Sequence, residues 1–405
     1  MSGLRRRLRP LVIPVLAVIS AFGVGSVFLI LTDIPALQLL FSGQPVAFLQ
    51  SAIGNVIHAY AALLTGAFGE PGKFAAAIKA GTPEAWATAL RPITETLVAA
   101  TPLIFTGLAI TVSFRSGVFN IGGDGQFILG ALGATTMALV LHDAMGITFA
   151  PLLLVLSIAA GIAFGAGWGF IPGFLKARTG AHEVITTIML NYIALMIVQL
   201  ALRTDFMRTP IGSAPISKAI DFVRVPALLP LPGLRLHWGF IVALLMAAVV
   251  SYFLFRTTKG FELRSAGLNL TAARYAGMSA GGSIILAMVI SGALAGMGGA
   301  FQVLGTVTQL SNDINLGYGW MAIALALLGG TRPLGVVIAA LLFGALNNGG
   351  QEMQIETGIP LDLLLFIQAL VIMFVAASEL VRKMYRIKEK PDVEEITSFE
   401  EGAVV

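Results

Sequence analysis

A series of long apolar segments dominates this sequence and limits the folds that it can adopt. A helix needs about 20 mostly apolar residues to cross the hydrocarbon core of a bilayer, and most of these segments approach that length. The chain is 57% hydrophobic and 11% charged, whereas about a quarter of the residues of a soluble domain are charged. We therefore predict an all-α integral membrane protein with about ten transmembrane helices, near residues 11–31, 92–114, 119–141, 150–172, 184–201, 238–255, 281–305, 317–330, 333–349 and 361–380.

The positions of lysine and arginine orient these helices. Arg5, Arg6, Arg7 and Arg9 precede the first apolar segment, and no small-residue cleavage site follows it. We interpret this segment as an uncleaved helix whose N-terminus faces the cytoplasm. Most of the 25 Lys and Arg residues then fall on the cytoplasmic side, and an even number of spans places both termini there. The net charge of +4 thus reflects membrane topology rather than nucleic-acid binding.

The spans and loops divide the chain into five predicted parts. These are an N-terminal tail with the first transmembrane helix, an extracytoplasmic segment with surface helices, the membrane core, a cytoplasmic loop within that core, and a charged cytoplasmic tail: residues 1–31, 32–91, 92–380, 256–279 and 381–405. Residues 48–68 are also apolar, but His58 and the following Gly69-Glu70-Pro71-Gly72 favour a surface helix over an eleventh span. Ten helices divide into two units of five. An odd number of crossings reverses direction, so such units would be inverted repeats, as in many transporters.

A polar, glycine-rich segment separates the second and third apolar segments. It reads Phe-Asn-Ile-Gly-Gly-Asp-Gly-Gln at 119–126, and its three glycines disfavour regular helix. Asn120, Asp124 and Gln126 add side chains that form hydrogen bonds. In hydrocarbon such a break is tolerated only where it lines protein or water. Two interpretations remain open: a break that lines a solute path, or a tight turn after Arg115 with Asp124 in the first turn of the next helix.

The remaining polar residues suit a neutral solute that is bound by hydrogen bonds. The middle of every predicted span lacks ionisable residues, which often mark proton or ion pathways. Amides recur instead, at Asn191 within the fifth span and near the ends of others. Such amides either contact a solute or bond to neighbouring helices. The amides near span ends are Gln199, Gln302, Asn347, Asn348 and Gln368.

Glycines at four-residue spacing predict close helix packing. Gly161, Gly165 and Gly169 share one face of a helix, as do Gly292 and Gly296. Small residues let two backbones approach closely, which is a common means of helix association in membranes. We expect these faces to pack against other helices.

The long cytoplasmic loop 256–279 contains a predicted short helix. Asn269 is a good N-cap and Gly277 is a good stop, so the helix has about two turns. Its weak amphipathicity favours docking to a protein partner over lying on lipid. Three of its residues are predicted to face outward: Leu270, Ala273 and Arg274.

Catalytic and metal-binding motifs fail on inspection. The chain has no cysteine and four scattered histidines, which gives no ligand cluster for a metal. The segment Gly69-Glu70-Pro71-Gly72-Lys73-Phe74 lacks the first glycine and the final Ser or Thr of a phosphate-binding loop. Asp124 has no second mid-span carboxylate with which an aspartyl protease would share a proton. The sequence therefore predicts a protein without enzymatic activity of its own.

Four motifs resemble a known family. The chain is similar to the larger permease subunit of bacterial nucleoside importers, within the branched-chain amino acid, ribose and simple-sugar permease superfamily of ABC transporters. The resemblance covers roughly residues 90–380. The motifs are GVFNIGGDGQ at 117–126, AHEVITTIMLNYIA at 181–194, RSAGLNLTAARYAGM at 264–278 and ALALLGGTRPLG at 324–335. Asp124 stands where this family usually has Glu, and His182 where Asn is common.

The resemblance implies roles for particular residues. It makes 92–380 a core permease domain and makes 264–278 a coupling helix that docks on a separate ATPase. The implied coupling residues are Arg264, Asn269, Leu270, Ala273, Arg274 and Gly277. The resemblance also implies that the broken segment lines the solute path. The candidate residues for contact with the solute are Phe119, Asn120, Gly122, Gly123, Asp124, Gln126 and Asn191.

The resemblance also implies partners and a location. It implies an ABC ATPase that binds ATP and Mg²⁺, a second and smaller permease, and an extracytoplasmic solute-binding protein or lipoprotein, all at a bacterial inner membrane. This chain would then be a multi-pass subunit that contacts membrane lipid and carries no cofactor itself. The expected cargo is a nucleoside. The alternatives are an ABC permease for a monosaccharide or another small polar solute, and, in another class, a stand-alone secondary carrier.

Overall fold

The computed structural model describes residues 2–209, 215–314 and 317–386, and these residues form helices and loops with no β-sheet. Residues 387–405 of the predicted tail lie outside this description. Short π-helical turns follow two of the helices, at Val140–Ala144 and Gln302–Val307. The helices are α1 (Ser2–Thr32), α2 (Ile34–Phe41), α3 (Pro45–Phe68), α4 (Pro71–Ala80), α5 (Pro83–Arg115), α6 (Gly123–Leu139), α7 (Ala150–Thr179), α8 (Glu183–Ala201), α9 (Gly239–Arg256), α10 (Thr258–Leu268), α11 (Leu270–Tyr275), α12 (Ala280–Phe301), α13 (Tyr318–Leu328), α14 (Pro333–Thr357), α15 (Leu361–Ala376) and α16 (Ser378–Met384).

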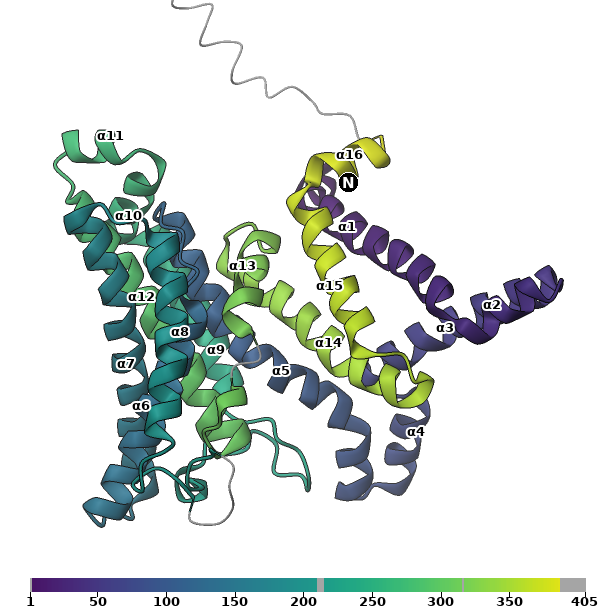
Figure 1. Cartoon of the computed structure of the whole chain (residues 1–405), viewed down its shortest axis with the longest axis horizontal. Helices are drawn as coiled ribbons and strands as arrows, with labels where there is room; N and C mark the ends of the chain where they lie inside the picture. Colours follow the sequence, from purple (N-terminus) through teal and green to yellow (C-terminus); the bar gives the residue numbers. More distant parts are fainter. Residues whose placement is uncertain (1, 210–214, 315–316, 387–405) are drawn as a thin grey trace, which may run out of the picture.

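The helices form two groups that α5 connects (Figure 1). Helices α6, α7, α8 and α12 form one bundle, and α1, α3, α14 and α15 lie on the other side. Helix α5 packs against both α12 and α14. The start of α1, the short α16 and the α10–α11 loop all lie at one end of the molecule. The first and the last helices of the described chain thus lie at the same end as the long loop.

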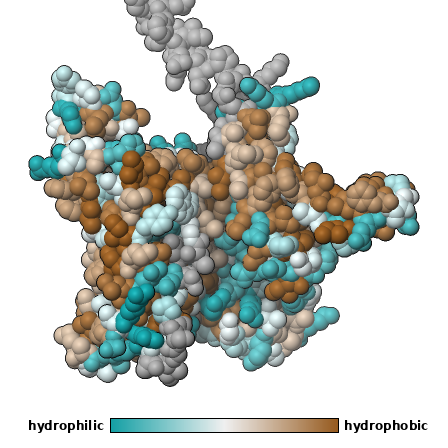
Figure 2. Space-filling view, in the orientation of Figure 1, coloured by the Kyte–Doolittle hydropathy of each residue, from teal (hydrophilic) through white to brown (hydrophobic). Residues whose placement is uncertain are grey.

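Hydrophobic residues run across the upper middle of the visible face and down its left side, and hydrophilic residues lie above them and over much of the lower part (Figure 2). Within the described residues, nine helical segments are long and apolar enough to cross a membrane. Eight of them coincide with predicted spans. The ninth, Pro45–Ala80, covers the predicted surface helix at 48–68, and α3 alone continues there for 24 residues, which makes this segment a further candidate span by length and composition. A single histidine did not interrupt that helix.

The two remaining predicted spans are shorter than expected. Helix α15 has 16 residues, and α13 has only 11, which corresponds to about 16 Å of helix. Helix α13 begins after Gly317, whose φ of 74° requires the left-handed conformation that glycine adopts easily. Its first residue, Tyr318, is buried inside the protein. Helix α13 is therefore a half-span that begins in the interior, which corrects the prediction of a full span at 317–330.

The glycine faces pack as predicted. Helices α7 and α12 make the most extensive helix–helix contact in the described chain. A Cβ atom on Gly165 of α7 would lie 2.7 Å from Cα of Gly296 in α12, and one on Gly292 would lie 3.2 Å from Cα of Gly169. Such distances leave room for hydrogen only. The backbones of the two helices therefore touch through these glycines.

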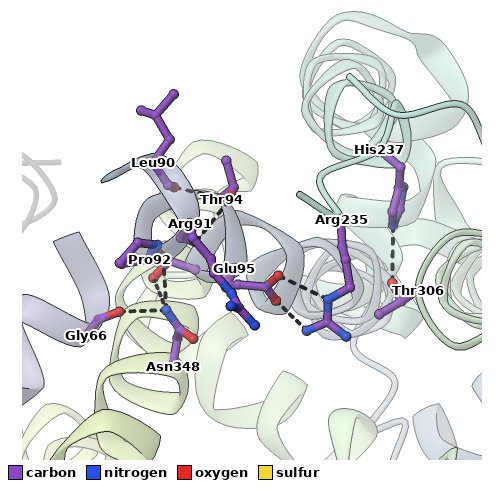
Figure 3. Close-up of polar contacts among 11 residues, drawn as sticks. Gly66, Leu90, Arg91, Pro92, Thr94, Glu95, Arg235, His237, Thr306 and Asn348 are labelled. Atoms are coloured by element: carbon purple, nitrogen blue, oxygen red, sulfur yellow. Dashed lines mark hydrogen bonds and ion pairs between the residues drawn. The ribbon is translucent and has the colours of Figure 1, made fainter. Parts of the chain in front are cut away.

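Amides near span ends join neighbouring helices (Figure 3). Asn348 of α14 donates from Nδ2 to the carbonyl oxygens of Gly66 (2.7 Å) and Pro92 (2.9 Å), which ties α14 to α3 and α5. Gln368 of α15 donates to Oδ1 of Asn347, at 2.8 Å. These three amides thus form hydrogen bonds between neighbouring helices, which is one of the two roles predicted for them. Satisfying such groups internally is necessary where no water is available.

Polar contacts of Arg235 and His237 hold the loop before α9 in place (Figure 3). Arg235 donates to Glu95 of α5 through Nε and Nη2, at 3.0 and 2.5 Å. His237 accepts from the backbone N–H of Gly239 at Nδ1, and its Nε2 lies 3.3 Å from Oγ1 of Thr306. Burial, and then the charge of Arg224, lower the pKa of His237 to about 4. His237 is therefore neutral near pH 7 and can donate from Nε2 to Thr306.

Candidate functional site

The broken segment forms a turn inside the protein. Helix α5 ends at Arg115, and α6 begins at Gly123 with Asp124 in its first turn. The segment is therefore a turn between two helices, as in the second of the two interpretations of the sequence. The turn is nevertheless not a surface loop, because Asn120 is fully buried and Gln126 is 1% exposed. A buried turn must satisfy its own polar groups.

Asn120 lies at the centre of this arrangement. Its Nδ2 donates to Oε1 of Gln126 at 3.1 Å and to Oγ of Ser291 in α12 at 2.9 Å. Its Oδ1 accepts from the backbone N–H of Gly122 at 2.8 Å. Asparagine commonly forms this local bond to the backbone two residues onward, and it thereby fixes a turn. Asn120 therefore holds the turn in shape and attaches it to α12.

Helix α8 supports the other side of the turn. Asn191 accepts from the N–H of Gly125 at 2.8 Å and donates to the carbonyl oxygen of Ile121 at 2.9 Å. Oγ1 of Thr187, one turn earlier in α8, accepts from the N–H of Ile121 at 3.3 Å. The backbone groups freed by the break are thus paired with side chains of α8. These bonds also fix which face of α8 points toward the core.

Asp124 joins two helix N-termini. Its Oδ1 accepts from the N–H of Gly319, in the first turn of α13, at 2.7 Å, while Asp124 itself lies in the first turn of α6. Helix N-termini carry partial positive charge, so each favours a carboxylate. A Cβ on Gly319 would lie 2.8 Å from Oδ1 of Asp124, so glycine permits this approach. The half-helix α13 is thereby attached to the broken segment.

These contacts define a polar cluster at the break. We use that name for Asn120, Asp124, Gln126, Thr187, Asn191, Ser291 and Gly319. Thr187, Ser291 and Gly319 were missed by the sequence analysis, because hydroxyls and glycines in apolar helices carry no signal of such a role. Only their positions opposite the break, up to 195 residues away in sequence, reveal it.

The predicted path residues fall into two groups. Asn120, Gly122, Gly123, Asp124 and Gln126 are buried and support the turn, and Asn191 is partly buried with both polar atoms bonded to it. Phe119 differs, because it is 43% exposed and its ring stacks on Phe114 with centroids 4.8 Å apart. Among the predicted residues, Phe119 is therefore the one that presents a large side chain to the surface.

The short helix of the long loop forms as predicted. Oδ1 of Asn269 accepts from the N–H of Ala272 at 3.0 Å, and Gly277, with φ of 80°, follows the end of α11. Ala273 corrects the predicted outward face, because it is only 3% exposed and α11 packs on α12. Leu270 and Arg274 are exposed as expected. A six-residue helix lying on another helix must bury one of its faces.

The loop also contains α10, a second helix that the sequence analysis did not predict. Arg264 lies on it, with the guanidinium over the rings of Phe255 and Phe261, at 5.3 and 6.0 Å from their centroids. Its Nε is buried and has no hydrogen-bond partner among the described residues. Arg264 lines a cleft of about 700 Å³ between the end of α9, α10 and residues 276–279. Arg264 thus lines the cleft beside α11 and does not lie on α11 itself.

Helix α10 connects this loop to the break. A Cβ on Gly267 of α10 would lie 2.7 Å from the backbone N of Gly117, so the two backbones are in contact. Gly117 begins the turn with a φ of 69°. Arg115, at the end of α5, donates to the carbonyl oxygens of Thr331 and Gly330, just beyond α13. The exposed helix α11, the turn and the half-helix α13 therefore form one contiguous structure.

These features define a class of protein. Within the described ranges, no group of three or more His, Cys, Asp or Glu residues could hold a metal ion. Interrupted and half-length helices that meet inside a multi-pass membrane domain are characteristic of transporters. The chain is thus a membrane transport subunit. It belongs to the family described as branched-chain amino acid transport system / permease component, which it matches over residues 93–376.

Curated relatives agree with this assignment. The chain is 37% identical to the guanosine ABC transporter permease protein NupP of Bacillus subtilis, over 95% of this chain and 99% of that protein. It is 36% identical to the nucleoside ABC transporter permease protein NupB of Lactococcus lactis, over 73% and 81% of the two chains. It is 35% identical to the glucose ABC transporter permease protein TsgB13 of Haloferax volcanii, over 73% and 78%. No solved structure matches the chain.

The family fixes the general role of the chain. It is the multi-pass permease subunit of an ABC importer, and it is not itself a catalyst. ATP hydrolysis and solute capture belong to an ATPase and a binding protein, which a permease of this family requires. The predictions of family and of a non-enzymatic transport role are confirmed.

Proposed function

We propose that this chain forms the translocation path of an ATP-driven nucleoside importer. The assignment of a nucleoside as the cargo rests on the similarity to the guanosine permease protein NupP, which extends over nearly the whole of both chains. The lack of charged residues in mid-span supports a neutral solute. A second cargo, a monosaccharide, is favoured by the similarity to the glucose permease protein TsgB13.

A competition assay separates the two cargoes. Cells that contain the whole importer should take up labelled guanosine, and an excess of unlabelled adenosine or uridine should reduce that uptake. An equal excess of glucose or ribose should leave it unchanged. Inhibition by the sugars, with none by the nucleosides, would assign the sugar cargo instead.

The proposed assembly contains a second permease, two ATPase domains and an extracytoplasmic binding protein or lipoprotein. Two further relatives support the second permease. NupC of Lactococcus lactis and NupQ of Bacillus subtilis are 27% and 28% identical to this chain, and each is a second permease protein from the organism that also has NupB or NupP. In this proposal α11 docks on the ATPase through Leu270 and Arg274. The proposal keeps two inverted units of five helices, because an odd number of crossings reverses the direction of a repeated unit.

The contiguous path from α11 to the break supplies a mechanism. In this proposal, movement of the ATPase shifts α11 and α10. The Gly267–Gly117 contact passes the shift to the turn, because two touching backbones cannot move independently. The polar cluster then moves α6, α8 and α13 together, since each is bonded to the turn or to its neighbour. The residues Asn120, Gly122, Gly123, Asp124, Gln126 and Asn191 reach the solute only if this movement opens the cluster.

Replacing Asn120 tests the role of the cluster. Asn120→Ala leaves the side chain of Gln126, the hydroxyl of Ser291 and the N–H of Gly122 without one partner each, and every such loss costs about 1–3 kcal/mol. We expect guanosine uptake at saturation to fall about tenfold or more, with the complex still assembled. Uptake kinetics and co-purification of the second permease measure the two effects.

Ser291→Ala provides the matched variant. It removes one bond of Asn120 and contacts no other part of the turn that the structure records. We expect a smaller fall in uptake than with Asn120→Ala. Uptake unchanged in both variants would contradict the proposed role of the cluster.

A further inference from the structure

Tyr192 lies at the middle of α8, where tyrosine is unusual for a helix that faces lipid. It is nine residues from Glu183 at one end of the helix and nine from Ala201 at the other. Its Cα is therefore about 13 Å along the helix from either end. Tyrosines of membrane helices concentrate instead at the membrane surfaces, where the hydroxyl meets water and headgroups. Tyr252 has such a place, four residues before the end of α9.

The side chain of Tyr192 points away from the protein and is 63% exposed. Its hydroxyl has no hydrogen-bond partner among the described residues. Tyr60, in the apolar helix α3, shows the usual solution, because its hydroxyl donates to the carbonyl oxygen of Phe22 at 2.7 Å and accepts from Ser26. A phenol hydroxyl left without a partner in hydrocarbon is unfavourable. This cost favours polar surroundings for Tyr192 in the assembled importer.

The polar cluster fixes the direction of Tyr192. Thr187 and Asn191 bond to the turn, and Ala194 is buried on the same inner side of α8. Because successive residues differ by about 100° around a helix, Tyr192 must point to the outer side. Rotation of α8 would break these bonds. The outer face consists of Ile185, Met189, Tyr192, Met196 and Leu200, all exposed.

The chemistry of this face fits one kind of solute. An aromatic ring stacks on a nucleobase without regard to base identity, because every base has a π-face. Met189 and Met196 lie one turn to either side of Tyr192, and the flexible, polarizable thioether of methionine adapts to contacts of different shape. The tyrosine hydroxyl can bond to the polar edge of a base or to water. The inner side of the same helix borders a backbone break, which a membrane domain tolerates only beside protein or water.

We propose that the outer face of α8 lines the translocation path and that Tyr192 stacks on the nucleobase near the bilayer centre. This inference rests on the proposed nucleoside cargo. It makes Tyr192 a residue that contacts the solute, and it gives Asn191 and Thr187 the task of positioning it. The polar cluster thus borders the inner side of α8, and the proposed contact surface is the outer side of the same helix.

Single-cysteine labelling tests the inference in the assembled importer. The chain has no cysteine, so Tyr192→Cys introduces the only thiol of this subunit. Thiol reagents react with the thiolate, which forms in water and not in hydrocarbon. We expect a water-soluble, membrane-impermeant thiol reagent to label Cys at position 192, and saturating guanosine to slow this labelling at least threefold. Labelling is measured on this subunit after its purification from the complex.

Leu245→Cys is the matched control. Leu245 is an exposed apolar residue within α9, on a face that carries no polar residue at that depth, and we expect it to remain unlabelled. Absence of labelling at 192 would place the face against lipid or against the second permease. Labelling that guanosine does not slow would show water without a solute contact. Either result, or equal labelling at both positions, overturns the inference.

Uptake kinetics provide an independent readout. We expect Tyr192→Ala to raise the half-saturating guanosine concentration about tenfold, and Tyr192→Phe, which keeps the ring, to stay within about threefold of the unchanged protein. Tyr252→Ala should behave like the unchanged protein. A normal half-saturating concentration in Tyr192→Ala, at equal amounts in the membrane, contradicts the inference while leaving the nucleoside cargo intact. If the unchanged importer takes up no nucleoside, the proposed cargo itself fails.

Discussion

Leucine in place of Gly165 is expected to remove the folded protein from the membrane, whereas leucine in place of Gly167 leaves its amount unchanged. Both positions lie in α7, two residues apart. The nearest atoms to a Cβ on Gly165 are backbone atoms of Gly292 and Gly296, with Cα of Gly296 at 2.7 Å. A Cβ on Gly167 meets nothing within 4 Å. The two variants thus differ only in whether the added side chain enters the α7–α12 contact.

The size of the expected effect follows from what would have to move. Overpacking a core usually costs about 1–3 kcal/mol, because flexible side chains give way. At Gly165 the obstacle is the backbone of α12, so the two helices must separate and lose the largest helix–helix contact among the described residues. Proteins are stable by only about 5–15 kcal/mol in total.

The amount of monodisperse protein after detergent extraction, together with its thermal unfolding midpoint, measures this effect. Gly165→Leu should yield little folded protein, and Gly167→Leu should match the unchanged chain. Equal yields and midpoints for the two variants would contradict the close backbone contact of α7 with α12.

Reversing the charge of α11 is expected to stop transport without unfolding the chain. The double variant Leu270→Asp, Arg274→Glu changes two exposed residues of α11 and leaves the buried Ala273 in place. Helix α11 therefore keeps its cap at Asn269 and its packing on α12. Interface residues that dominate binding each contribute about 2 kcal/mol or more, so the loss of two should weaken ATPase docking by well over tenfold.

Guanosine uptake and ATPase co-purification measure this second prediction. Uptake should fall to background, and less ATPase should co-purify with this subunit. Lys383→Glu is the control, because Lys383 is an exposed basic residue of α16 at the same end of the molecule. Normal uptake in the double variant would show that α11 is not the docking element. An equal loss with Lys383→Glu would point to a general effect of charge at that surface.

Much of the fold could be predicted from the sequence, because hydropathy and length are local properties. Eight of the predicted spans are helices that can cross a membrane, and the cap at Asn269 and the stop at Gly277 lie where their chemistry indicates. The half-helix α13 could not be predicted in this way. An apolar stretch does not reveal that Gly317 and the glycines after Leu328 limit it to 11 residues.

The candidate site was harder to predict, because its contacts join distant parts of the chain. The polar residues at 119–126 were recognised, but their burial depends on Ser291 and Gly319, which lie more than 160 residues away. The buried side of Ala273 likewise depends on α12. Tyr192 was not selected, because an aromatic residue in an apolar helix is unremarkable until its exposure at mid-span is known.

The dependence of guanosine uptake on the ATPase tests the central claim most directly. Labelled guanosine uptake is compared in cells with the intact importer, in cells lacking this chain, and in cells whose ATPase subunit carries an inactivated phosphate-binding loop. An ATP-driven nucleoside importer predicts that uptake falls to background in both altered strains. Guanosine uptake that requires this chain but persists with the inactive ATPase would contradict the account and identify a secondary carrier.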